Sequence, residues 1–197
     1  VRSVRWAKRS AYIPLDVEGK TLGLVGLGRI GFAVMRKALA LGLVVLAYDP
    51  YARDQYPGEA RFTEDLGELF RSADAISVHV PSTPETAGLI DAHLLRQMKP
   101  TAYLINTSRG AVVDEGALVQ LLQERKIAGA GLDVFVNEPV APDNPLVSLD
   151  NVILTPHVAA LTRECGVRMT VEAVRQVVDL LEGRTPPHIV NRKELQL

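Results

Sequence analysis

The sequence predicts an α/β protein with a doubly wound parallel sheet that helices cover on both faces. Short aliphatic runs alternate with stretches of helical periodicity along most of the chain. Strands that alternate with helices in this way favour parallel pairing through right-handed crossovers. The strand-like runs are apolar on both sides, which is typical of a sheet buried on both faces. With 197 residues, 47% of them hydrophobic, the chain is long enough for one such domain and part of a second.

The first expected strand, 21–26, leads into an expected helix over 29–42, in which apolar residues recur at helical spacing. A second strand is expected over 43–49. The next expected helix, 63–73, has Thr63 as a plausible N-cap, and acidic residues follow it in the first turn, where they suit the helix dipole.

The remaining segments continue the alternation as far as residue 156. Strands are expected at 75–80, 102–108, 128–135 and 151–156, and helices at 91–99 and 114–126. The pattern then changes to one long amphipathic stretch, 162–183, with apolar residues three and four positions apart. No strand-like run follows this stretch, so we expect it to lead out of the sheet domain.

A glycine-rich turn joins the first expected strand to the first expected helix. It reads G-x-G-x-x-G at Gly26, Gly28 and Gly31, and in this context the pattern indicates a Rossmann-type dinucleotide-binding fold. The first glycine permits a tight turn, the second a close approach to a pyrophosphate, and the third close packing of helix and strand. We expect the pyrophosphate at the helix N-terminus, near the N–H groups of Arg29 and Ile30.

Asp49 is expected to select the cofactor. It ends the next predicted strand, 18 residues after Gly31, close to the roughly 20 residues typical of the fold. A carboxylate there accepts hydrogen bonds from the adenosine ribose and repels a 2′-phosphate, so the sequence favours NAD over NADP. Arg53, four residues later, leaves NADP open.

The sequence lacks the complete motifs of a phosphate loop, a short-chain dehydrogenase and a metal site. The GKT of a phosphate loop occurs at 19–21, but Pro14 stands where that motif needs glycine, and the strand follows it instead of preceding it. No tyrosine has a lysine four residues later, as a short-chain dehydrogenase requires. The four histidines form no close ligand pair and Cys165 stands alone, so no metal site is expected.

Charge points to small-molecule partners, and the one cysteine, Cys165, cannot form an internal disulfide, so nothing in the sequence demands an oxidising compartment and we expect a cytoplasmic location. The formal net charge of −1 argues against nucleic acid or an anionic membrane as the main partner. No apolar stretch approaches the roughly 18 residues of a spanning helix. The basic first residues loosely resemble a transit peptide, but we prefer a chain that is a piece of a longer protein, entered in or just after a helix.

Five motifs occur in a fixed order along the chain. They are GLVGLGRIG, VPSTPETAGLI, INTSRGAVVDEGAL, GLDVFVNEP and ILTPHVAA. With them the sequence strongly resembles the D-2-hydroxyacid dehydrogenases, which include phosphoglycerate dehydrogenase and glyoxylate/hydroxypyruvate reductase. The resemblance implies a linker or the end of a crossover helix at 1–15, an NAD-binding domain at 16–160, and a return helix and tail at 161–197. This last segment would lead toward a largely absent substrate domain.

The resemblance implies three catalytic residues. Arg109 would bind the substrate carboxylate and 2-oxo group, a task that suits the forked donors of a guanidinium. His157 would be the general acid/base, since imidazole carries a proton near neutral pH. Glu138 would hold the imidazolium. Taken alone, Arg109 is also compatible with a loop charge, and a histidine after a strand is more often structural than catalytic.

The resemblance also implies a set of cofactor contacts. They are Val80 and Pro81 on the adenosine side, Thr86 near the phosphates, Thr107 and Ser108 by the nicotinamide ribose, and Asp133 at the carboxamide. For Val80 and Pro81, simple packing at the end of a strand explains the residues equally well. His79 and His93 are assigned to structure or surface.

Together these features predict an NAD-dependent oxidoreductase that interconverts a D-2-hydroxy acid and its 2-oxo acid by hydride transfer. Resemblance to the family also suggests a homodimer. The alternative is an NAD(H)-sensing binding protein, like the corepressor relatives of this family, which keep the same three residues. A cofactor domain for another reaction, such as adenosylhomocysteine hydrolysis, is disfavoured because Arg109, Glu138 and His157 are all in place.

Overall fold

The computed structural model describes residues 15–52, 60–192 and 194. The chain divides into two compact units, Val1–Pro156 and His157–Leu197, and each is described by itself. The first unit contains the sheet and the glycine-rich turn, and the second contains one long helix.

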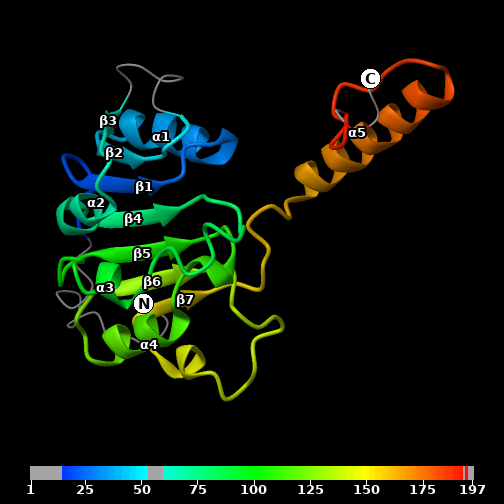
Figure 1. Cartoon of the computed structure of the whole chain (residues 1–197). Helices are drawn as coiled ribbons and strands as arrows, with labels where there is room; N and C mark the ends of the chain where they lie inside the picture. Colours follow the sequence, from blue (N-terminus) through cyan, green and yellow to red (C-terminus); the bar gives the residue numbers. More distant parts are fainter. Residues whose placement is uncertain (1–14, 53–59, 193, 195–197) are drawn as a thin grey trace, which may run out of the picture. The chain divides into compact units, whose positions relative to one another are not determined.

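The first unit is built on a seven-stranded sheet in the order β3-β2-β1-β4-β5-β6-β7 (Figure 1). The strands are β1 Thr21–Val25, β2 Val44–Tyr48, β3 Arg61–Phe62, β4 Ala75–Val78, β5 Tyr103–Asn106, β6 Gly129–Leu132 and β7 Val152–Leu154. Every neighbouring pair is parallel. The chain builds outward from β1 in one direction and then, from β4, in the other. The point between β1 and β4 is therefore the topological switch point, where dinucleotides bind in such folds.

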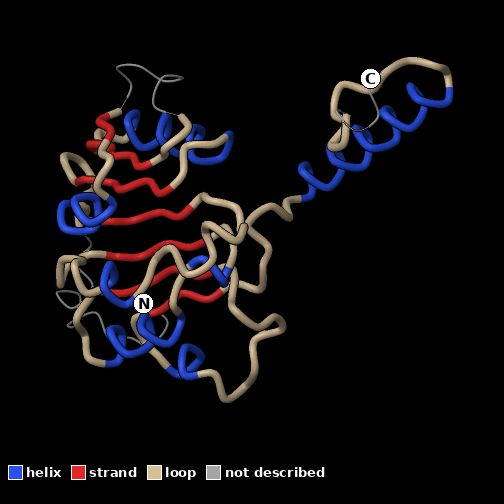
Figure 2. The backbone as a smooth tube through the Cα atoms, viewed as in Figure 1, coloured by secondary structure: helices blue, strands red, loops and turns tan. Residues whose placement is uncertain are grey.

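A helix or 3₁₀ turn lies between most successive strands, as the alternating colours of Figure 2 show; among the described residues, none lies between β2 and β3. In this unit the helices are α1 Arg29–Ala40, α2 Leu66–Ser72, α3 Ala92–Leu95 and α4 Glu115–Gln123, with 3₁₀ turns η3 Gly110–Val112 and η4 Pro145–Ser148. The predicted doubly wound α/β fold is confirmed. The helix expected over 91–99 is reduced to the single turn of α3.

The predicted N-cap of α2 is wrong. The helix begins at Leu66, and Asp65 caps it by accepting a hydrogen bond from the Gly67 N–H at 2.8 Å. Thr63 lies two residues earlier, where its hydroxyl bonds to Glu68. The short strand β3, Arg61–Phe62, was not expected either, because two residues at a sheet edge carry no hydrophobic period.

Two hydrophobic cores cover the two faces of the sheet. Along β2, Val45 and Ala47 belong to the core under α1, whereas Leu46 between them belongs to the core under α2, α3 and α4. Successive side chains of a strand point to opposite faces, so both faces are buried. Met35 of α1 and Phe70 of α2 are fully buried in these two cores. Burying each of these side chains stabilises the fold by about 1.5–3 kcal/mol.

The second unit contains α5, Arg163–Leu181, which confirms the predicted amphipathic helix. Thr162 caps it, because its hydroxyl accepts a hydrogen bond from the Cys165 N–H at 3.0 Å. No residue of α5 is buried, and Val167 and Val174 are more than half exposed. Among the described helices, none combines the length and apolar character needed to cross a membrane.

Candidate functional site

The glycine-rich turn occupies the switch point of the sheet. Gly26 has a φ of +93°, and a Cβ added there would lie 2.8 Å from Val80 Cγ1, so only glycine fits between β1 and the end of β4. A Cβ on Gly31 would lie 2.2 Å from the Gly26 carbonyl oxygen, which explains the close approach of α1 to the turn. Gly28 is the N-cap of α1, and no described atom would lie within 4 Å of a Cβ there. The helix N-terminus therefore opens onto free space, with Arg29 and exposed Ile30 in its first turn.

Asp49 is tied to this turn from the end of β2. Its Oδ2 accepts the backbone N–H of Leu27 at 2.7 Å, and its Oδ1 accepts the N–H of Tyr51 at 2.8 Å. Each carboxylate oxygen keeps a second lone pair, so both can still accept from ribose hydroxyls. The structure thus places the predicted ribose ligand beside the predicted pyrophosphate site. Arg53, which left NADP open, lies outside the described residues.

The segment after β4 carries three of the predicted cofactor contacts. Val80 packs on the glycine turn through its contact with the Gly26 position. The Thr86 hydroxyl donates to the Pro81 carbonyl oxygen at 2.5 Å and accepts the Thr83 N–H at 2.8 Å. A hydroxyl has one proton to donate. Thr86 therefore stabilises its own loop, and it would have to release Pro81 before it could donate to a phosphate.

His79 lies directly behind the glycine turn. Its backbone carbonyl carbon would be 3.0 Å from a Cβ on Gly26, and its ring Nε2 lies 2.9 Å from Ser77 Oγ. Burial lowers the pKa of His79, so the neutral ring is favoured. The structural assignment made for His79 agrees with this position, whereas the partnership with Ser77 was not foreseen.

The turn that carries Arg109 is held by Asn106 at the end of β5. Asn106 is 1% exposed; its Oδ1 accepts from the Ser108 N–H at 3.0 Å and hydroxyl at 2.8 Å, and its Nδ2 donates to the Arg109 carbonyl oxygen at 3.0 Å. Thr107 and the Arg109 side chain are exposed. Asn106 was missed as a site residue, although a buried amide at the end of a strand needs hydrogen-bond partners and so signals a structured turn.

Asp133 and Glu138 lie on the loop after β6. Asp133 is 3% exposed; its N–H donates to the Asn106 carbonyl oxygen at 3.0 Å, and its Oδ1 accepts the Thr155 hydroxyl at 2.5 Å. Glu138 Oε1 accepts the N–H of Phe135 at 2.9 Å. The carboxylate of Glu138 is thus oriented by its own loop.

Gly110 brings the Arg109 turn against the Glu138 loop. A Cβ added at Gly110 would lie 2.0 Å from the carbonyl carbon of Phe135 and 2.5 Å from the backbone nitrogen of Val136. Only a glycine permits this approach. The structure therefore brings together Arg109, Asp133 and Glu138, three of the predicted site residues, at the ends of β5 and β6.

His157 is the first residue of the second unit. Its side chain is exposed, and its φ of +53° is a left-handed conformation that few residues other than glycine adopt. Strained backbone conformations of this kind occur most often at functional positions. The conformation of His157 therefore supports a functional role, but does not say which role. Its predicted pairing with Glu138, in the first unit, stays a prediction.

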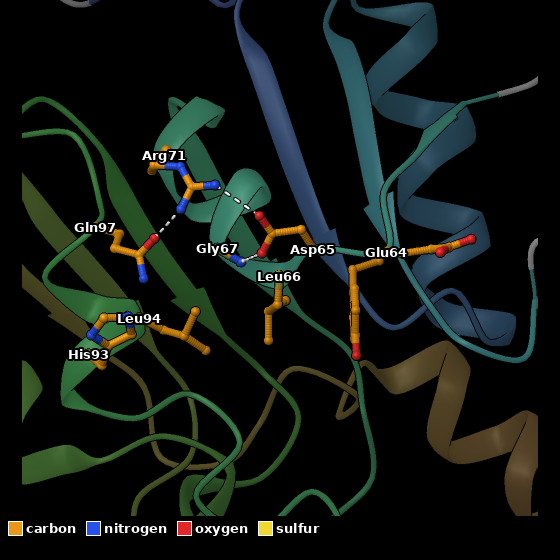
Figure 3. A pocket seen from close by; sticks show the side chains of 9 residues that line it. Glu64, Asp65, Leu66, Gly67, Arg71, His93, Leu94 and Gln97 are labelled. Atoms are coloured by element: carbon orange, nitrogen blue, oxygen red, sulfur yellow. Dashed lines mark hydrogen bonds and ion pairs between the residues drawn. The ribbon is translucent and has the colours of Figure 1, made fainter.

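Two cavities of the described chain are lined by other residues. One, of about 570 Å³, is lined mainly by residues in and next to α2 and α3, and there Arg71 bonds to both Asp65 and Gln97 (Figure 3). The other, of about 540 Å³, is lined in part by Glu115 and Val136. None of the predicted site residues lines either cavity. The geometry of the glycine turn is therefore a better guide to cofactor binding than cavity size.

Comparison with known proteins agrees with this geometry. Residues 1–159 match the family model described as D-isomer specific 2-hydroxyacid dehydrogenase, NAD binding domain. A glyoxylate reductase from Korarchaeum cryptofilum is 43% identical, with 100% of this chain and 60% of the relative covered. A D-3-phosphoglycerate dehydrogenase from Synechocystis is 45% identical, with 97% and 34% covered. The chain thus spans between about a third and three-fifths of the length of these two relatives.

Solved structures show the same similarity. A D-lactate dehydrogenase with NAD⁺ from Lactobacillus jensenii superposes with a TM-score of 0.84 at 32% identity, covering 92% of this chain and 58% of that one. A D-lactate dehydrogenase from Aquifex aeolicus, complexed with NAD and lactic acid, gives a TM-score of 0.82 at 36% identity, covering 92% and 59%. These identities are high enough for the similarity to extend beyond the fold.

Proposed function

The chain belongs to the D-isomer specific 2-hydroxyacid dehydrogenase family as its NAD-binding domain, and from this premise we propose that the whole protein interconverts a D-2-hydroxy acid and its 2-oxo acid. The observation that carries the proposal is the contact of Gly110 with Phe135 and Val136. This contact would hold Arg109 and Glu138, two of the three charged groups that the proposed reaction uses, on adjoining turns at the same end of the sheet as the cofactor site.

Cofactor binding follows from the switch point. The open N-terminus of α1 would receive the pyrophosphate, because unpaired N–H groups and the helix dipole favour an anion there. Asp49 would hold the adenosine ribose. Asp133, fixed by Thr155, would accept from the carboxamide and so decide which face of the nicotinamide meets the substrate. Val80, Pro81, Thr107 and Ser108 would line the rest of the path, and Thr86 would support it through its loop.

The reaction needs a proton as well as a hydride. When bound, NADH supplies the hydride to the carbonyl carbon. Arg109 would grip the substrate carboxylate and polarise the carbonyl, a role that a forked guanidinium performs in two hydrogen bonds. His157 would deliver its proton to the carbonyl oxygen as the hydride arrives, and Glu138 would stabilise the imidazolium before that step. In the reverse direction His157 takes the proton back from the hydroxyl.

The organisation of the whole protein is part of the proposal. Residues 16–160 form the NAD-binding domain, and 161–197 return toward a substrate domain; the exposed valines of α5 support this, since an amphipathic helix needs an apolar partner. Residues 1–14 of the proposed linker or crossover segment, 1–15, lie outside the described residues. We propose a cytoplasmic homodimer, as the resemblance to the family suggests.

A substrate panel tests this function. The protein produced from its complete coding sequence is assayed for NADH oxidation with glyoxylate, hydroxypyruvate, pyruvate and 3-phosphohydroxypyruvate, with NADPH in parallel. We expect turnover of at least one acid, and a preference for NADH. Tight NADH binding without turnover of any acid would contradict the proposed reaction and favour the NAD(H)-sensing binding protein.

A further inference from the structure

Glu115, the first residue of α4, bonds to two distant points of the loop that carries Glu138. Its Oε2 accepts the backbone N–H of Val136 at 3.0 Å, and its Oε1 accepts the Nδ2–H of Asn144 at 3.0 Å. The loop runs from the end of β6 at Leu132 to the start of η4 at Pro145. The half-buried carboxylate of Glu115 thus joins the first part of this loop, at Val136, and its last part, at Asn144, to α4.

The Val136 bond acts next to the carboxylate of Glu138. Phe135 and Val136 are consecutive: the Phe135 N–H donates to Glu138 Oε1, and the Val136 N–H donates to Glu115 Oε2. The same two residues form the surface on which Gly110 rests. The position of Val136 therefore fixes the amide that orients Glu138 and the contact that sets the Arg109 turn.

The bond between Asn144 and Glu115 holds the last part of the loop. Asn144 Oδ1 accepts the Leu146 N–H at 2.9 Å as the N-cap of η4, and Leu146 is fully buried. Asn144 therefore cannot move without disturbing the core. Its Nδ2–H bond orients the Glu115 carboxylate, so that the second oxygen points at Val136.

We propose that Glu115 is a positioning residue for the dehydrogenase reaction. Its two hydrogen bonds clamp the loop 133–144 and so keep Glu138 in place relative to Arg109. The inference rests on the proposed function. In this role Glu115 would touch neither substrate nor cofactor. Its effect passes through Val136 and Phe135, and it should appear in catalysis more than in cofactor binding.

A simpler role is available to a glutamate in the first turn of a helix, where it favours the helix dipole. Substitution Glu115→Asp separates the two roles. Aspartate keeps the charge at the same position in α4, but its side chain is one methylene shorter and loses the reach to Val136 and Asn144. Glu115→Ala removes both roles. Glu124→Ala is the matched control, because Glu124 is the C-cap at the other end of α4 and, in the described contacts, its side chain bonds only to Gln120.

The experiment combines hydrogen exchange with kinetics on the protein from its complete coding sequence. We expect amide exchange in 133–138 to rise about tenfold in Glu115→Asp and Glu115→Ala, the order that one net hydrogen bond provides. We expect kcat to fall about tenfold as well, with the Kd of NADH within about twofold of wild type, because the switch point is untouched. The pH at which kcat/KM for reduction falls to half should move lower, since a misplaced Glu138 stabilises the imidazolium less. Glu124→Ala should match wild type in all four measurements.

Two results would overturn the proposal. Unchanged exchange of 133–138 in both Glu115 variants would show that there is no clamp. Faster exchange with a wild-type kcat and pH profile in Glu115→Asp would make Glu115 a structural residue without a part in catalysis. If wild-type protein turns over no acid, the proposed function fails and the catalytic part of this proposal fails with it, whereas the exchange data still decide whether the clamp exists. Thermal unfolding of each variant separates these outcomes from loss of the fold.

Discussion

Leu27 donates its backbone N–H to Asp49 Oδ2 over 2.7 Å. Asp49, the residue expected to bind the cofactor ribose, therefore also stabilises the glycine turn. The bond joins the end of β2 to the residue between Gly26 and Gly28. An aspartate at this position therefore has two tasks, and substitutions can separate them.

Substitution Asp49→Asn keeps an oxygen acceptor for Leu27 but removes the charge. We expect weaker NADH binding and a smaller NADH-over-NADPH ratio, because repulsion of the 2′-phosphate is lost. Asp49→Ala leaves the Leu27 N–H without its acceptor and should weaken both cofactors, by about tenfold or more for a bond to a charged group. Fluorescence titration of both variants measures this. Tighter NADPH binding by Asp49→Ala than by wild type would show that the Leu27 bond does not support the turn.

Substitution Gly110→Ala places a methyl group 2.0 Å from the Phe135 carbonyl carbon. The Arg109 turn must then move away from the Glu138 loop, at a cost of about 1–3 kcal/mol in the free energy of unfolding, as for other overpacked sites. We expect kcat to fall more than NADH affinity. Denaturant unfolding and NADH titration check the two parts.

Gly116→Ala is the control for that substitution. A Cβ there would meet only Asp114 Oδ1, at 3.5 Å, and the residue lies within α4. Because alanine favours a helix over glycine, Gly116→Ala should be neutral or more stable, by up to about 1 kcal/mol. Equal losses of stability in Gly110→Ala and Gly116→Ala would contradict the close contact at Gly110.

His79 should make the domain less stable in mild acid. Burial lowers the pKa of His79 in the folded state, so the unfolded chain binds the proton more readily. The stability is fully present above the unfolded-state pKa of about 6.5 and declines as the pH falls below it, until the folded-state pKa is passed. In His79→Gln the free energy of unfolding should fall less steeply between pH 7 and 5. Urea unfolding at several pH values measures the slope.

His93→Gln provides the comparison, because His93 is exposed on α3. Its slope should follow wild type. If His79→Gln and wild type lose stability in parallel as the pH falls, burial of the His79 ring does not control this pH dependence.

The sequence predicted those parts of the fold that have a local signal. The apolar runs and the helical periodicity predicted a parallel sheet, and the spacing of Gly26, Gly28 and Gly31 to Asp49 predicted the switch-point turn. The two-residue strand β3 was not predicted, and the helix expected over 91–99 is only the single turn of α3, because such short elements carry no hydrophobic period. The N-cap of α2 was assigned to Thr63, although Asp65 has an equally suitable side chain. Only the structure, in which the helix begins at Leu66, shows that Asp65 is the cap.

The supporting residues of the site were less predictable for a different reason. Glu115 bonds to Val136 and Asn144, which are 21 and 29 residues away along the chain. Gly110 meets Phe135 across a similar interval. Such contacts exist only after β5 and β6 have paired, and a single sequence holds no local trace of them. Arg109, Asp133 and Glu138 were identified through family motifs and not through their partners.

The role of His157 as proton donor is tested by His157→Ala, with kcat and the Kd of NADH measured on the protein from its complete coding sequence. We expect a loss of about 10²–10⁴-fold in kcat, the range for a general acid/base, with the Kd of NADH within about twofold of wild type. His157→Gln should behave in the same way and guards against a variant that fails to fold. A kcat within about threefold of wild type in both variants, too small for general acid/base catalysis, would contradict the assignment of His157 as the proton donor.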